Sequence, residues 1–305
     1  PFNLVGLEAL RELFTQSKAA PALPDTTLNV LDLPKLSSLV DELSQTGNGL
    51  VMTMGKGGVG KTTIAASVAV SLAKRGHKVH LTTSDPAAHL SYTLDGSLPN
   101  LQVSRIDPKV ETERYRRFVL ENQGKGLDAE GLAVLEEDLR SPCTEEIAVF
   151  QAFSRIIKEA DDHFVIMDTA PTGHTLLLLD ATGAYHREMV RQMGQTHDNL
   201  LTPMMLLQDP EKTKVIIVTL AETTPVLEAA NLQQDLRRAE IEPWAWVINS
   251  SLAAAKPSSP FLVTRANREL PLINDVTEQF AERIALTPLQ NEEPVGAALL
   301  AKMAG

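Results

Sequence analysis

A glycine-rich run at residues 55–63 constrains the fold more than any other feature of this sequence. It reads Gly-Lys-Gly-Gly-Val-Gly-Lys-Thr-Thr and fits the pattern G-x-x-x-x-G-K-[ST]. A short apolar run precedes it at residues 50–54, and an apolar helical pattern follows at residues 62–74. Such a turn between a strand and a helix surrounds phosphate oxygens with backbone N–H groups and the positive end of the helix dipole. The run therefore predicts a nucleoside triphosphate site.

The residues of this loop have distinct expected roles. Lys61 is expected to reach the β- and γ-phosphates, and the Thr62 hydroxyl is expected to ligate Mg²⁺. A second lysine, Lys56, follows the first glycine. Without further information, its side chain would be expected to be solvated. The residues expected to contact nucleotide are Gly55, Lys56, Gly57, Gly58, Val59, Gly60, Lys61, Thr62 and Thr63.

The chain after residue 50 alternates short apolar strands with helices. Strands are predicted at residues 50–54, 78–83, 164–167, 215–218 and 244–248. Continuously apolar strands of this length are typical of a parallel sheet that helices cover on both faces. We therefore predict an α/β fold of the P-loop NTPase type over residues 50–305, with a helical insertion at about residues 107–160. Residues 1–49 are predicted to be a connector with short helices.

Composition excludes several functional classes. The chain has 28 Lys and Arg against 39 Asp and Glu, a formal net charge of −11, which argues against a nucleic-acid-binding surface. Apolar runs stay below the ~18 residues that cross a bilayer. The single cysteine, Cys143, cannot form an internal disulfide. We expect a cytoplasmic protein that does not bind nucleic acid.

The run at residues 56–63 resembles the deviant Walker A motif of one class of P-loop ATPases. That class contains the arsenical pump ATPases, the tail-anchored-protein targeting ATPases, the nitrogenase iron protein and the division-site and plasmid-partitioning ATPases. In this class the early lysine, here Lys56, reaches the nucleotide of a partner. The resemblance implies two nucleotide sites that face each other.

Two acidic segments match the switches of this class. Ser-Asp-Pro-Ala-Ala-His at residues 84–89 resembles switch I, in which the aspartate, here Asp85, helps to hold Mg²⁺ and to position the attacking water. An aspartate after a strand is otherwise often only a cap. Asp-Thr-Ala-Pro-Thr-Gly-His-Thr at residues 168–175 resembles switch II of the arsenical pump and tail-anchored targeting ATPases. The resemblance gives Asp168 the role of the Walker B acid, while Leu177 replaces an arginine common in the family.

Two later segments resemble the adenine side of the family's nucleotide site. Asn249, at the end of a predicted strand, matches the family's adenine-reading asparagine. Thr-Pro-Leu at residues 287–289, with Pro288 at its centre, resembles a second adenine-side loop.

The sequence around Cys143 predicts the start of a helix. Ser141 suits the N-cap, Pro142 suits the first helical position, and Ile147, Phe150, Phe153 and Ile157 are expected to form the buried face. Cys143 then lies in the first turn, where free N–H groups stabilise a thiolate, the ligand that As(III) and Sb(III) prefer. The alternative is a small buried apolar residue.

The resemblance to arsenical pump ATPases assigns Ser141, Cys143 and His174 to the metalloid sites. His174 is otherwise a loop histidine with ordinary hydrogen bonds. His174 is six residues from Asp168, so metalloid capture is expected to bias the same segment that senses the γ-phosphate. Because trivalent arsenic takes about three soft ligands, further thiolates must come from outside this chain. A homologous first half of the same polypeptide would supply them, which makes this chain the second half with its linker.

The leading hypothesis is an ATPase that uses ATP and Mg²⁺, is stimulated by arsenite or antimonite, and drives efflux through an integral membrane carrier. It would be cytoplasmic and attached to the inner membrane through that carrier. The alternative is an ATP-dependent targeting factor for tail-anchored membrane proteins. That alternative is disfavoured because one cysteine cannot form the C-x-x-C zinc site that such factors use. A surface-positioning ATPase is disfavoured because residues 294–305 lack a basic amphipathic pattern.

Overall fold

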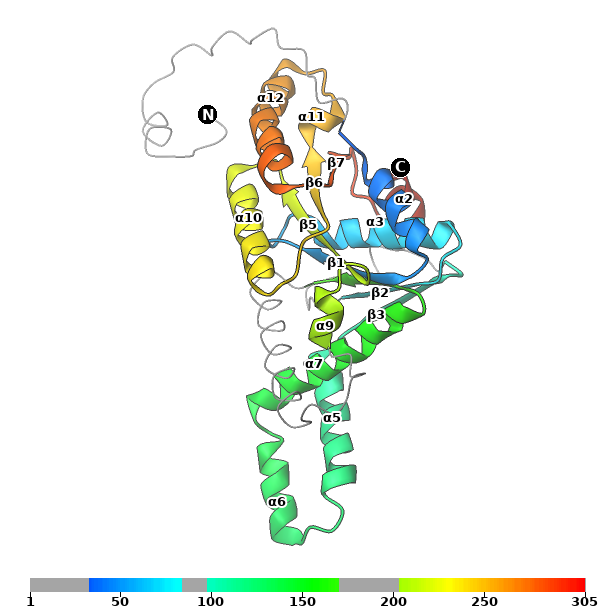
Figure 1. Ribbon diagram of the computed structural model, residues 1–305, viewed down its shortest axis with the longest axis vertical. Coiled ribbons are helices and arrows are strands. Elements are labelled where there is room, and N and C mark those ends of the chain that lie inside the picture. The colour runs from blue at the N-terminus through cyan, green and yellow to red at the C-terminus, as the bar shows by residue number, and fades with distance from the viewer. Residues whose placement is uncertain (1–32, 84–97, 170–202, 305) are drawn as a thin grey trace, which may run out of the picture.

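The computed structural model describes residues 33–83, 98–169 and 203–304 (Figure 1). The expectations for Asp85, His174 and Leu177 concern residues outside these ranges.

One parallel sheet organises the described residues. Its seven strands are hydrogen-bonded in the order β3-β2-β4-β1-β5-β6-β7, and every neighbouring pair is parallel. The strands are β1 Gly49–Met54, β2 Val79–Thr83, β3 Leu101–Arg105, β4 Phe164–Asp168, β5 Thr213–Leu220, β6 Ala245–Ser251 and β7 Ile284–Pro288. The predicted α/β fold with a parallel sheet is confirmed.

Helices cover both faces of this sheet (Figure 1). One layer consists of α2 Leu36–Thr46, α3 Lys61–Lys74 and α13 Ala297–Met303. The other layer contains α7 Pro142–Lys158, α9 Pro203–Gln208, α10 Thr223–Arg238, α11 Leu252–Ala255 and α12 Pro260–Asp275, with the short turns η1 Glu159–Asp161 and η3 Val276–Phe280. Two further helices, α5 Pro108–Gln123 and α6 Ala129–Asp138, extend away from the sheet.

The apolar continuity of the strands follows from this layering. In β1, Leu50, Met52 and Met54 pack into the α7–α12 layer, whereas Val51 packs into the α2–α3 layer. Successive side chains of a strand point to opposite faces, so a strand covered on both sides is apolar at most positions. This is why β1, β2, β4, β5 and β6 were recognisable from sequence.

Two strands were not predicted from the sequence. In β3 the side chains of Leu101–Arg105 are exposed or half-buried, because β3 is an edge strand whose polar residues face solvent. The other strand, β7, is short and ends at Pro288, within the segment predicted to be a loop. That prediction is wrong for Thr287 and Pro288, which continue the ladder with β6, and only Leu289 lies beyond the strand.

The packed core extends upstream of residue 50. Leu36, Leu39, Val40 and Leu43 of α2 are buried with helix α3 and the sheet. The N–H of Leu286 in β7 also donates to the carbonyl of Pro34 at 2.9 Å. Apolar positions repeated at helical spacing must be covered, and α3 and β7 cover them here. A domain boundary at residue 50 would therefore separate α2 from the elements that it covers.

The insertion between β3 and β4 is helical, as the sequence indicates. Helices α5 and α7 pack along each other, and α6 continues the arm at the bottom of Figure 1. Phe150, Phe153 and Ile157 of α7 are buried, but Ile147 is 44% exposed, so its prediction as a buried residue is wrong. Ile147 lies in the half of α7 that follows α6, one turn before Phe150. None of the helices in the described ranges has the length and apolar character of a membrane span.

Removal of one apolar contact in α2 tests whether this helix stabilises the domain. Leu39 is 2% exposed, so Leu39→Ala is expected to lower the free energy of unfolding by about 2–4 kcal/mol. The control is Gln45→Ala on the exposed face of α2, with an expected change within about 0.5 kcal/mol. Urea denaturation measures both. Equal effects would show that α2 contributes little to the core.

Candidate functional site

The glycine-rich loop connects β1, in the interior of the sheet, to helix α3. Gly58 and Gly60 have φ angles of 84° and 91°, which glycine adopts without steric cost. A side-chain Cβ at Gly55 would collide with the backbone carbonyl of Val218 in β5. Gly57 and Gly58 are exposed at the apex of the loop. The result is a glycine-rich backbone cradle at the carboxyl ends of the strands, in which neighbouring groups leave no room for a side chain at Gly55 and Gly60.

Two lysines flank the cradle. Lys61 begins α3, is 6% exposed, and its Nζ donates to the carbonyl of Lys56 at 3.2 Å. Lys56 is about half exposed and forms an ion pair with Glu228 of α10. Glu228 lies 172 residues away in the sequence, so no local pattern indicated this pairing. Lys61 therefore faces the loop backbone, and Lys56 faces outward.

Asp168 is the centre of the hydrogen bonds below the cradle. It ends β4 and is completely buried, in register with Thr53 of β1 on one side and Thr83 of β2 on the other. Its Oδ2 accepts from Thr62 Oγ1 at 2.8 Å and from Thr83 Oγ1 at 3.1 Å. Thr83 was not recognised from sequence, since a threonine at the end of a β-strand is common.

These residues fit a magnesium nucleotide. A hydroxyl and a carboxylate at the end of parallel strands are the hard oxygen ligands that Mg²⁺ takes, together with phosphate oxygens and water. Gly57 and Gly58 add no side chain at the exposed apex of the loop, so backbone N–H groups there could face a phosphate. The structure thus brings together Gly55–Thr63 and Asp168, as the sequence predicts; Asp85 lies outside the described residues.

Asn249 connects the cradle to the edge of the sheet. Its Nδ2 donates to the carbonyl of Val59 in the loop at 2.9 Å, and its Oδ1 accepts from Thr287 Oγ1 at 2.7 Å. Pro288, the last residue of β7, pairs in register with Ser251 of β6. Asn249 and Pro288 therefore both lie at the carboxyl ends of β6 and β7. No sequence pattern indicates the bond from Asn249 to Val59, which positions the loop.

The candidate metalloid ligands lie at the start of α7. Ser141 is its N-cap, and Ser141 Oγ accepts from the N–H of Cys143 at 3.3 Å. Cys143 is exposed, which excludes the alternative in which it is a small core residue. His174 lies outside the described residues, so the three predicted ligands are not all positioned.

Comparison with known proteins identifies close relatives. A model of the anion-transporting ATPase family matches residues 49–205 and 178–305. An arsenical pump-driving ATPase of Escherichia coli is 63% identical over 306 residues, covering all of this chain and 52% of that protein. One from Acidiphilium multivorum is 63% identical over 300 residues, covering 97% of this chain and 51% of that protein. The chain thus spans about half the length of these curated relatives.

A more distant relative has comparable length. The ATPase GET3 of Mycosarcoma maydis is 26% identical over 319 residues, which cover 90% of this chain and 91% of that protein.

Alanine at two loop glycines separates backbone strain from steric contact. Gly58→Ala would add a Cβ in open space, so only the left-handed φ opposes it, at a cost of about 1 kcal/mol. Gly60→Ala would also meet the side chain of Asn249 and displace its bonds to Val59 and Thr287, so the loss is expected to be roughly 1–2 kcal/mol larger. Urea denaturation measures the difference. Equal losses would contradict the role of Asn249 as a tie to the loop.

Proposed function

The chain belongs to the anion-transporting ATPase family, and from this premise we propose that it is one half of a metalloid-stimulated ATPase. In this proposal ATP hydrolysis with Mg²⁺ is stimulated by As(III) or Sb(III) and drives their efflux through an integral membrane carrier. The other half is a homologous first half of the same polypeptide. This chain covers about half the length of relatives that are 63% identical to it, and this coverage supports the arrangement.

The observation that carries the proposal is the arrangement of Lys61, Thr62 and Asp168 around the glycine cradle. Lys61 and Thr62 begin α3, and Asp168 ends β4. The Thr62 hydroxyl donates a hydrogen bond to the Asp168 carboxylate at 2.8 Å. A phosphoryl transfer needs little covalent chemistry from the protein, so fixed charges and N–H groups around the phosphates account for most of its catalysis. This site supplies both.

Each residue of the site has a role in this proposal. Lys61 neutralises charge on the β- and γ-phosphates, and backbone N–H groups of Gly57–Gly60 orient them. Thr62 and Asp168, together with Asp85, would hold Mg²⁺, which supplies further charge neutralisation when bound. Asp85 orients the attacking water. Asn249 and Pro288 lie on the adenine side.

Lys56 has a separate role, because it faces outward. Its ion pair with Glu228 joins two side chains that are 46% and 36% exposed. Such exposed pairs contribute only about 0–1 kcal/mol, so a nucleotide phosphate of the facing half can replace Glu228. Exchange of Lys56 from Glu228 to that phosphate would couple hydrolysis to the closed arrangement of the two halves.

The metalloid site in this proposal contains Ser141, Cys143 and His174. An exposed thiol at a helix start is accessible to a soft trivalent ion, and thiolates of the first half complete its coordination. The protein acts at the cytoplasmic face of the inner membrane, where it docks on its carrier. Delivery of tail-anchored proteins is less well supported, since the relative called GET3 is only 26% identical.

Removal of the loop lysine tests the nucleotide site. In the complete protein, Lys61→Ala is expected to lower ATP hydrolysis about 100-fold, because a preorganised charge on the transferring phosphoryl group is lost. The control, Lys74→Ala, removes an exposed lysine from the last turn of the same helix and should leave the rate unchanged. Phosphate release measures both. Retained hydrolysis in Lys61→Ala would remove this site from the mechanism.

Replacement of the cysteine tests the metalloid site separately. In the complete protein, Cys143→Ser is expected to reduce stimulation by antimonite about tenfold or more, because a hydroxyl is a poor ligand for a soft ion. Basal hydrolysis and nucleotide binding should remain. Glu146→Gln, on the exposed side of the same first turns of α7, is the control. Unchanged stimulation of Cys143→Ser would refute the assignment of Cys143.

A further inference from the structure

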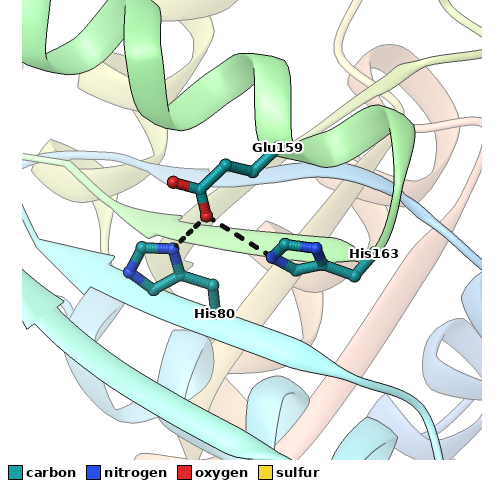
Figure 2. Close-up of side chains that lie close together, drawn as sticks. All are labelled: His80, Glu159 and His163. Atoms are coloured by element: carbon teal, nitrogen blue, oxygen red, sulfur yellow. Dashed lines mark hydrogen bonds and ion pairs between the residues drawn. The ribbon is translucent and has the colours of Figure 1, made fainter.

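Two histidines and a glutamate lie close together at the amino-terminal ends of the strands, opposite to the end that carries the nucleotide site (Figure 2). His80 is the second residue of β2, Glu159 begins η1, and His163 directly precedes β4. The strands are parallel, and the glycine loop follows the carboxyl end of β1, whereas these residues lie at the amino-terminal ends of β2 and β4. The cluster is therefore separate from the site described above.

The three side chains direct potential ligand atoms toward one another. Glu159 Oε2 lies 2.8 Å from His80 Nδ1 and 3.4 Å from His163 Nε2, and all three atoms lie within 4.8 Å of one another. In Figure 2 the carboxylate of Glu159 points between the two rings. Ligand atoms about 2.1 Å from a tetrahedral zinc ion are roughly 3.4 Å apart. A small movement of Glu159 Oε2 away from His80 Nδ1 would bring the distance between these two atoms to that value as well.

Ser104 contacts the other ring nitrogen of His80. Ser104 Oγ donates to Thr82 Oγ1 at 2.9 Å and lies 2.7 Å from His80 Nε2. A serine hydroxyl can accept from an N–H at Nε2, and in that tautomer Nδ1 presents its lone pair toward Glu159. A metal ion between Nδ1 and the Glu159 carboxylate, which lie 2.8 Å apart, would use that lone pair.

His163 presents Nε2 to the cluster, 3.4 Å from Glu159 Oε2. The side chains of His80 and His163 are only 5% and 9% exposed, so both rings are held in place by the surrounding core. The other nitrogen of His163, Nδ1, is buried with no hydrogen-bond partner among the described residues.

We propose that His80, Glu159 and His163 bind a divalent transition-metal ion of the zinc class. Two imidazoles and one carboxylate suit Zn²⁺, Co²⁺ or Ni²⁺ better than Mg²⁺, and the absence of sulfur in this trio separates it from a site for As(III). Glu159 is 37% exposed, so the ion enters from its side and water takes the fourth position. The Ser104–Thr82 pair orients His80, as partners of ligating histidines usually do.

The bound ion would connect two parts of the fold. Glu159 directly follows the last residue of α7, the helix that begins beside Cys143, whereas His80 belongs to β2, which ends at Thr83 beside Asp168. A metal ion would fasten the carboxyl end of α7 to the sheet. The expected consequence is a higher unfolding temperature with Zn²⁺ than after chelation.

The test is a titration of the chelator-treated full chain with Zn²⁺ and Co²⁺, in a Cys143→Ser background that removes the thiol. We expect one equivalent of Zn²⁺ per chain by calorimetry and a Co²⁺ visible spectrum of four-coordinate intensity. Glu159→Gln and His163→Gln should each weaken binding at least tenfold, and Ser104→Ala about tenfold through His80. Asp162→Asn, an exposed acid beside the cluster, should bind like the parent.

Two results would overturn the proposal. Without stoichiometric Zn²⁺ binding by the folded parent chain, the cluster would be a hydrogen-bonded group of side chains that holds no metal. Equal binding by the parent, Glu159→Gln and His163→Gln would place the ion elsewhere. Neither result depends on ATP hydrolysis, and circular dichroism of each variant shows whether it has folded.

Discussion

The site depends on one carboxylate oxygen of Asp168, which accepts hydrogen bonds from two threonine hydroxyls. Thr62 comes from the first turn of α3 and Thr83 from the end of β2, while Asp168 itself ends β4. The two bonds fix the carboxyl ends of neighbouring strands against the helix that follows the glycine loop. Because Asp168 is fully buried, its carboxylate cannot turn away to water. The loop, the helix and the sheet therefore keep one relative position.

Much of this arrangement follows from the sequence. The covered strands are mostly apolar, and the glycine pattern specifies a strand, a cradle and a helix, so the fold and the positions of Lys61 and Thr62 beside the cradle could be predicted. The expectation for Asp168 came from the family resemblance. The edge strand β3 could not, because its residues alternate in polarity without a covered face. The pairing of Lys56 with Glu228 depends on residues far apart in the chain, which no local pattern reports.

The glycine loop and the histidine–glutamate cluster, at opposite ends of the strands, differ in how strongly the sequence indicates them. The glycine loop repeats a known spacing over nine residues, whereas His80, Glu159 and His163 come from two segments about 80 residues apart. Only the parallel pairing of β2 with β4 brings the histidines together. Clusters that arise from strand register carry no spacing rule, so they become visible only in the folded chain.

The amide of Asn249 gives the loop a mechanical connection to the start of the domain. On β7, Leu286 binds the carbonyl of Pro34, and the next residue, Thr287, binds Asn249, which binds the carbonyl of Val59. Three hydrogen bonds in series thus join the segment entering the domain to the phosphate cradle. A displacement of that segment would be transmitted to the cradle through this series of hydrogen bonds, along the edge strand of the sheet.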